Sequence, residues 1–434
     1  MTSQKAHQPL FVLQQHTSAV MTCALDAQGV FPHLLLSGDV DGIVNLWDLE
    51  LRAVLLSFPA VQAARPAPQG EGKGSSYAAF ANEGVLKVGF LAFRGFSDAA
   101  TAEEGSLEVC FYTQCRNQHL YIWRATLGDG EGDSSLEGDT ADVCRVSLEL
   151  LHTINVPQHG FCTVPSVPLP SGEMQLAVPH DNDGVLSLWN VDGNAKEGTS
   201  REGLRVSCCQ SFPAAGAGTK CGIIMCICYR DSEHLAVAFE SGHVSLNNTR
   251  GERLAILRAF AETALACVWS GSTVLASSAE GQLHCYRVSD LSREKDGPTE
   301  DEGFSVSLTV QWEVSLRKGV GSLALQRHLA VVGSWDHTLR LYDEGSGRVI
   351  TILTFHSGIV NEVAMAPLSA AQCASFGFDV RHPRWCGAQV PNSGRSSSTE
   401  DDSVYLFASA GKDFTIALWR VDFKVLRAVA VCSA

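Results

Sequence analysis

Seven copies of one strand–turn–strand pattern constrain the fold of this chain more than any other feature of its sequence. Each copy consists of a short apolar segment, a tight polar turn and a second segment in which apolar residues alternate. In every copy a turn residue precedes the last residue of the second segment by six positions. A small β-sheet of this kind cannot bury both of its faces alone, so the copies are expected to stack side by side until a ring closes.

Four copies are clear and three have degraded residue types. The clear copies occupy residues 34–49, 177–191, 329–343 and 406–421, and the weaker ones occupy 110–125, 235–249 and 274–288. The spacing joins Asp41 to Trp47, Asp183 to Trp189, Asp336 to Tyr342 and Asp413 to Trp419, and in weaker form Asn117 to Trp123, Ser241 to Asn247 and Glu280 to Tyr286. This pattern resembles the WD40 repeat. It predicts an all-β fold, a single seven-bladed WD40 β-propeller over residues 9–434, with repeats that end near residues 47, 123, 189, 247, 286, 342 and 419.

The chain is longer than such a ring requires. Seven blades of about 40 residues need roughly 280 residues, and the chain has 434. The surplus is predicted to form long flexible insertions at about 59–76, 128–142, 192–203, 289–303 and 368–403, which have loop-like compositions. The Ser-rich acidic stretch 393–403 is a candidate phosphorylation site.

Two repeats carry a full set of polar residues that can hydrogen-bond the turn to the preceding loop. The sets are His16, Ser37, Asp41 and Trp47 in the first repeat, and His356, Ser409, Asp413 and Trp419 in the last. The same structural role is expected for Asp183, Trp189 and Asp336. These residues could also be interpreted as catalytic pairs, but fold-holding hydrogen bonds are the favoured interpretation.

Ring closure can use either end of the chain. Residues 11–13 precede His16 as residues 349–355 precede His356, and residues 425–431 offer a competing strand. WD40 rings usually close by lending an N-terminal strand to the last blade, so residues 11–13 are predicted to close this one.

The sequence carries no catalytic, cofactor or metal motif. The sequence lacks GxSxG, GxxxxGK[ST], HExxH and CxxC. Cys226 and Cys228 are expected to face the same side of one strand, with no nearby ligands to complete a zinc site. The net charge of −15 and the short basic stretch 381–384 argue against direct nucleic-acid binding.

The chain is expected to be intracellular. Residues 1–10 are polar, no apolar run is long enough to span a bilayer, and many of the 15 cysteines lie in apolar segments, as expected of reduced, buried thiols.

Motifs in the last two repeats are more specific than the general repeat. They are Trp-Asp-His at 335–337, Phe-His-Ser at 355–357, and Gly-Lys-Asp at 411–413 followed by Ala-Leu-Trp at 417–419. With the opening segment 11–20, they resemble the family of ASTRA-associated protein 1, known in animals as guanine nucleotide-binding protein beta-subunit-like protein 1. The long insertion 368–403 and the strand-like segment 425–431 depart from the family pattern.

The resemblance implies a non-catalytic adaptor in the nucleus and cytoplasm. Its expected partners are subunits of the ASTRA assembly, linked to chromatin remodelling, and the co-chaperone complex that matures PI3-kinase-like kinases. No cofactor and no membrane are expected. No G-protein γ subunit is expected either, because only ten residues precede the first strand and no heptad pattern is present that could pair with one.

Three alternatives remain open: another WD40 interaction scaffold, a substrate receptor of a cullin-type ubiquitin ligase, and an enzyme on a propeller scaffold. The receptor pattern WDxxR is not met, because Arg52 stands one residue too late after Trp47 and Asp48.

Overall fold

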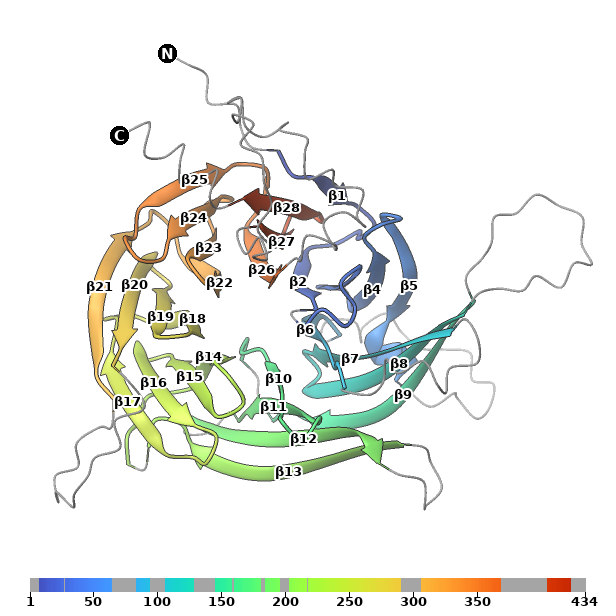
Figure 1. Ribbon diagram of the computed structural model, residues 1–434, viewed down its shortest axis with the longest axis horizontal. Coiled ribbons are helices and arrows are strands. Elements are labelled where there is room, and N and C mark those ends of the chain that lie inside the picture. The colour runs from blue at the N-terminus through green and yellow to red at the C-terminus, as the bar shows by residue number, and fades with distance from the viewer. Residues whose placement is uncertain are drawn as a thin grey trace, which may run out of the picture.

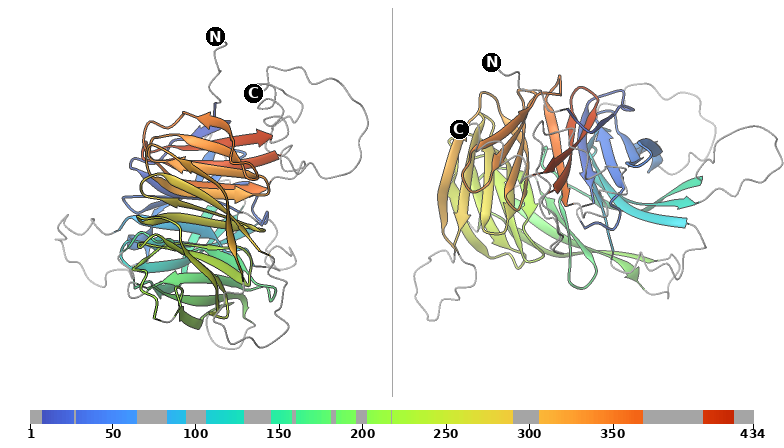
Figure 2. Two further views of the ribbon diagram at one scale, coloured as in Figure 1. Left: turned by 90° about the vertical axis from the view of Figure 1, so that its left-hand side faces the viewer. Right: turned by 45° about the horizontal axis from the view of Figure 1, so that its top comes forward.

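The computed structural model describes residues 8–26, 28–64, 83–93, 106–128, 145–157, 160–180, 184–195, 203–216, 218–289, 306–367 and 404–422. Their strands form seven four-stranded antiparallel sheets arranged as blades around a common axis (Figure 1). The views of Figure 2 show the same sheets standing side by side around that axis. The predicted seven-bladed β-propeller is therefore confirmed.

The strands of each blade follow one another from the centre of the ring outward. Blade 1 has β2 (Val20–Leu25), β3 (Leu34–Asp39), β4 (Ile43–Asp48) and β5 (Ala53–Pro59). Blade 2 has β6 (Val85–Phe90), β7 (Ser106–Cys115), β8 (His119–Gly128) and β9 (Arg145–Asn155). Blade 3 has β10 (Ser166–Pro168), β11 (Met174–Pro179), β12 (Val185–Ala195) and β13 (Gly203–Pro213). Blade 4 has β14 (Ile224–Tyr229), β15 (His234–Phe239), β16 (His243–Asn248) and β17 (Arg253–Arg258).

The remaining blades complete the ring. Blade 5 has β18 (Ala264–Ser270), β19 (Thr273–Ser278), β20 (Gln282–Val288) and β21 (Leu308–Ser315). Blade 6 has β22 (Val320–Gln326), β23 (Leu329–Ser334), β24 (Leu339–Asp343) and β25 (Val349–Leu353). Blade 7 has β26 (Val360–Pro367), β27 (Val404–Gly411), β28 (Ile416–Asp422) and, outermost, β1 (Phe11–Leu13).

The core lies between the blades. Each of the seven clusters of buried apolar side chains joins two neighbouring sheets, including blades 7 and 1. The aromatic residues of the third strands belong to these clusters, and Trp123, Tyr342 and Trp419 are at most 2% exposed. Burial of these large side chains against the next sheet is the main force that holds the ring together.

The ring closes through the N-terminal strand. β1 pairs antiparallel with β28, and Phe11 lies opposite Leu418. The prediction that residues 11–13 close the ring is confirmed, and the competing segment 425–431 lies outside the described residues.

The insertions are described only at their ends. Residues 60–63 of the first predicted insertion form the short helix α1 (Ala60–Ala63). β12 continues to Ala195 and β13 starts at Gly203, so the predicted insertion 192–203 begins too early; the strands extend because Asp192 still pairs with Arg205. Residues 65–82, 129–144, 196–202, 290–305 and 368–403 lie outside the described part of the chain.

The innermost strand of blade 3 is unusually short. The residues before β10 are held by the side chain of Gln114 on β7, whose amide donates to the carbonyl of Cys162 at 2.9 Å and accepts from the N–H of Val164 at 2.8 Å. A side chain thus supplies the hydrogen bonds that a neighbouring backbone would otherwise make.

The cysteines are unpaired thiols throughout the described ranges. Cys226 and Cys228 on β14 both pack against the core between blades 4 and 5, which confirms that they face the same way. In the part of the chain that the structure describes, no helix is long and apolar enough to cross a membrane.

Candidate interaction site

The loops at one end of the ring form its most featured surface. Because each innermost strand begins where the turn between the second and third strands lies, the loops that enter β2, β6, β10, β14, β18, β22 and β26 share one face with those seven turns. We call this end of the ring the turn face.

In blade 1 a chain of hydrogen bonds holds the entering loop. The indole N–H of Trp47 donates to Oγ of Ser37 at 2.7 Å, and Ser37 lies 2.8 Å from Nε2 of His16. With its proton on Nδ1, His16 donates to a carboxylate oxygen of Asp39 at 2.8 Å. The histidine is therefore locked between a strand and a turn.

The prediction that Asp41 accepts from His16 is wrong. Asp39 takes that place, and its other oxygen also accepts the backbone N–H groups of Asp41 and Ile43 at 3.0 and 2.9 Å. Because Asp39 lies at the end of β3, its carboxylate can both accept from the buried histidine and cap the turn. The side chain of Asp41 is exposed instead.

In blade 7 the predicted set forms with Asp413. Trp419 donates to Ser409 at 2.9 Å, Ser409 lies 2.8 Å from His356, and Nδ1 of His356 lies 3.1 Å from Asp413. Gly411 occupies the position that Asp39 has in blade 1, so the carboxylate has to come from two residues later. Burial alone would raise the pKa of Asp413, but hydrogen bonds and charge from His356 outweigh it and hold that pKa well below its usual range.

The remaining predicted residues differ from these sets. Asp336 pairs with Arg340 at 2.7 Å instead of a histidine. The buried indole N–H of Trp189 has no acceptor. Trp47 and Trp419 donate to a serine ten residues earlier in the chain, but the residue ten positions before Trp189 is Pro179. Asp183 lies outside the described residues. The hydroxyl of Thr113 accepts from the indole N–H of Trp123 at 2.9 Å and so takes the place of the serine in blade 2, which the sequence pattern did not predict.

The Ser–His–Asp chains have the order of a hydrolase triad but not its access. Ser37 and Ser409 are 0% exposed, and each hydroxyl is occupied by a tryptophan N–H. A nucleophile must reach a substrate carbonyl, so these chains hold the fold.

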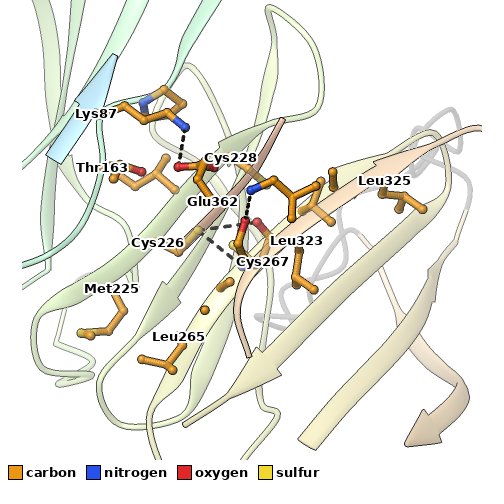
Figure 3. A pocket seen from close by; sticks show the side chains of 18 of the residues that line it. Lys87, Thr163, Met225, Cys226, Cys228, Leu265, Cys267, Leu323, Leu325 and Glu362 are labelled. Carbon is orange, nitrogen blue, oxygen red and sulfur yellow. Dashed lines mark hydrogen bonds and ion pairs between the residues drawn. The ribbon is translucent and has the colours of Figure 1, made fainter. Parts of the chain in front are cut away.

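The central channel is the cavity enclosed by the innermost strands. It has a volume of about 990 Å³. Apolar side chains form most of its wall, among them Met225, Leu265, Leu323 and Leu325 (Figure 3). The wall is suited to apolar contact and carries little that could perform chemistry.

One ion pair crosses the channel wall. Nζ of Lys87 on β6 lies 3.1 Å from Glu362 on β26, and both side chains are about one-fifth exposed (Figure 3). Burial acts to lower the pKa of Lys87, but the carboxylate of Glu362 outweighs it and the pKa is raised. This ion pair was not predicted from the sequence. The pattern that could have indicated it is a charged residue at the third position of each of two apolar inner strands.

A hydrogen bond with Cys267 lowers the pKa of Cys226, whereas other buried thiols of the ring are poorly suited to chemistry. Sγ of Cys226 lies 3.4 Å from the backbone N of Cys267. Burial raises the pKa of Cys110, Cys115 and Cys285 to about 12, so they remain thiols at neutral pH. Within the described ranges, no three or more His, Cys, Asp or Glu residues are arranged to hold a metal ion.

Aromatic side chains are exposed on the turn face. Phe161, Trp335 and Phe414 are 65%, 37% and 46% exposed, and Trp335 also lines the mouth of the channel. Large exposed aromatic groups are typical of protein-binding surfaces. On the outer side of the ring, the guanidinium of Arg52 lies 4.8 Å from the ring centroid of Phe11, so the residue considered for a cullin-receptor motif packs on the closing strand.

Comparisons with known proteins agree with this architecture. The family model "WD domain, G-beta repeat" matches residues 7–48. ASTRA-associated protein 1 of Aspergillus niger is 22% identical over 392 residues, which cover 82% of this chain and 80% of that protein. This match confirms the resemblance to ASTRA-associated protein 1 that the motifs of the last two repeats indicate.

Solved structures share the fold at low identity. Sqt1 of Saccharomyces cerevisiae is 12% identical with a TM-score of 0.53, covering 96% of this chain and 99% of that one. Raptor of Chaetomium thermophilum is 12% identical with a TM-score of 0.55, covering 96% of this chain but only 30% of Raptor. These similarities support the propeller fold alone.

Proposed function

We propose that this seven-bladed WD40 propeller, which resembles ASTRA-associated protein 1, is a non-catalytic adaptor that holds proteins together within an ASTRA-type assembly. The observation that carries the proposal is the similarity to that protein over 82% of the chain. A rigid ring with loops gathered on one face suits this role, because such a scaffold presents side chains for binding without itself changing shape.

The chemistry of the ring supports an adaptor over an enzyme. The two Ser–His–Asp chains have serines that are 0% exposed, and the channel wall is mostly apolar with a mutually neutralising ion pair. The proposed partners are ASTRA subunits and the co-chaperone complex that matures PI3-kinase-like kinases, and the proposed location is the nucleus and cytoplasm.

Affinity purification of the tagged full chain from its source cell tests the proposal. We expect enrichment of AAA+ helicases, a chromatin-associated pseudokinase and kinase-maturation co-chaperones, and tagged protein in nuclear and cytosolic fractions. Enrichment of a cullin and its adaptor instead, or of none of these proteins, would overturn it.

A matched control makes the purification informative. The variant Trp123→Asp places a charge in the core between blades 1 and 2, where Trp123 is 1% exposed, and should unfold part of the ring. Partners that bind the folded ring are expected to disappear with this variant, whereas general chaperones that bind exposed apolar chain are expected to increase.

A further inference from the structure

We propose that the turn face of blades 6 and 7 binds an acidic segment of a partner protein that also carries a large aromatic or apolar side chain. This inference rests on the proposed adaptor function, because it gives the chemistry of a partner. The binding surface consists of Arg317, Lys318, Trp335, Lys412 and Phe414, and we call it the basic–aromatic patch.

Positive charge on this patch is not neutralised by the protein. Arg317 and Lys318 lie in the loop that enters β22, and Lys412 lies in the turn between β27 and β28; all three are exposed. Among the described residues, none of the three forms an ion pair. An uncompensated cluster of cations on a chain of net charge −15 is best explained by an external anion.

The acidic groups of the same turns are already engaged. Asp336 forms two hydrogen bonds with Arg340, at 2.7 and 3.1 Å, and Asp413 lies 3.1 Å from His356. Asp336 is thus paired with Arg340 and Asp413 accepts hydrogen bonds inside its own turn, so neither carboxylate is paired with a cation of the patch.

Within each blade, backbone hydrogen bonds join the turn that carries patch residues to the entering loop. The backbone N–H of Trp335 donates to the carbonyl of Gly319 at 2.9 Å, which places the indole beside Lys318. Trp335 also packs directly over Gly319, where any β-carbon would clash with its ring. In blade 7, the N–H of Lys412 donates to the carbonyl of Ile359 at 2.8 Å, in the loop that enters β26.

The aromatic members of the patch are held outward. Trp335 is 37% exposed at the mouth of the channel. Phe414 is 46% exposed and adopts a φ of 68°, a left-handed conformation that glycine serves in four of the seven turns. This φ belongs to the turn geometry that all seven blades share, and the exposed Phe414 ring is available for apolar contact.

Blades 4 and 5, beside the patch, are richer in acidic groups on this face. Blades 4 and 5 expose Glu240, Glu262 and Glu280 in their turns and entering loops. The boundary lies between Gly281 and the backbone of Lys318, which are in contact. An acidic segment is therefore favoured on the patch over the acidic turns of blades 4 and 5.

A protein segment fits the patch better than a nucleic acid does. Three cations are few beside the six to ten phosphate contacts of a typical nucleic-acid site. The two exposed aromatic rings offer apolar area that an acidic peptide with one aromatic side chain can bury.

Fluorescence anisotropy with purified full-length protein tests the patch. The probe is a fluorescein-labelled peptide of about twelve Asp and Glu residues with one central Trp. We expect the triple variant Arg317→Glu, Lys318→Glu, Lys412→Glu to bind it at least tenfold more weakly. Trp335→Ala should weaken the acidic Trp peptide severalfold, and the same peptide with Ala in place of its Trp should bind the wild type severalfold more weakly.

The control variant Lys220→Glu removes an exposed cation from the same face, in the loop that enters β14 of blade 4. We expect it to change the affinity less than twofold, and circular dichroism to show that every variant keeps the fold. The proposal is overturned if the control weakens binding as much as the triple variant does, or if the triple variant binds as tightly as the wild type. It is also overturned if a peptide with Lys in place of its acids binds equally well, or if a twelve-nucleotide DNA binds more tightly.

The two proposals can fail separately. If the triple variant loses peptide binding but the purified partners include no helicases or co-chaperones, the patch is retained and the ASTRA-type adaptor is rejected. Enrichment of those partners with an unchanged triple variant in both assays would retain the adaptor and reject the patch.

Discussion

His16 and His356 each join a loop to a strand through buried hydrogen bonds. His16 links Asp39 to Ser37, and His356 links Asp413 to Ser409. A typical hydrogen bond adds only about 0.5–1.5 kcal/mol to stability, but leaving a buried partner unsatisfied costs about 1–3 kcal/mol. Removal of one member should therefore have a larger effect than the bond itself contributes.

Asp413→Asn should destabilise the protein by about 1–3 kcal/mol at neutral pH, because His356 and the backbone N–H of Ser357 lose a charged acceptor. Urea unfolding measures the change. The control is Asp41→Asn, at the equivalent turn position of blade 1; Asp41 is exposed, and a change within about 0.5 kcal/mol is expected. Equal effects at both positions would contradict the assignment of Asp39 as the acceptor in blade 1.

The same substitution should change the acid dependence of stability. The folded-state pKa of Asp413 lies below that of an unfolded aspartate, which is about 3.9. Its contribution is therefore complete above that value and is lost as the pH falls through the folded-state pKa. The difference between wild type and Asp413→Asn should stay constant from pH 7 to about pH 5 and shrink as unfolding is measured below about pH 4.

Turns are the elements that the repeat specifies most sharply. In every blade the residue directly after the turn residue of the six-residue spacing has a positive φ, between 65° and 93°; these residues are Gly42, Gln118, Gly184, Gly242, Gly281, His337 and Phe414. The six-residue spacing read from the sequence therefore reports a backbone geometry shared by all seven turns.

Gly242→Ala should destabilise the ring by about 2–4 kcal/mol, because its β-carbon would overlap the carbonyl oxygens of Phe260 and Glu262 in addition to the strained φ of 80°. Gly218→Ala is the matched control, since its φ is 79° with open space around it, and should cost about 1 kcal/mol. Thermal and urea unfolding compare the two. A control as damaging as Gly242→Ala would show that strain, not close packing, is the cause.

The sequence predicts the strands better than it predicts the hydrogen-bonded sets of histidine, serine, aspartate and tryptophan. Strand alternation and the turn spacing locate all seven blades and the closing strand, because both follow from local geometry. The acceptor of His16 could not be predicted, since Asp39 and Asp41 both fit the motif and only the path of the chain decides between them. The role of Gln114 depends on a contact with Cys162 and Val164, 48 and 50 residues away, that no local pattern records.

At the scale of the whole ring, Lys87 and Glu362 connect blades 2 and 7 across the innermost strand of blade 1. A double-mutant cycle with Lys87→Met and Glu362→Gln should give a coupling energy of about 0.5–2 kcal/mol, because each single variant leaves a largely buried charge unpaired. Urea unfolding of the four proteins measures it. Single effects that add to within about 0.3 kcal/mol would show that the pair does not stabilise the ring.

The pairing of β1 with β28 has a consequence for the synthesis of the protein. Phe11 leaves the ribosome early, but its partner Leu418 is made about 400 residues later. At 5–20 residues per second, this delay is roughly 20–80 s. Throughout that time the newborn chain carries an apolar strand with no edge to join, and blade 7 stays incomplete until β28 has been made. Chaperones that act on nascent chains therefore have a defined target in Phe11–Leu13.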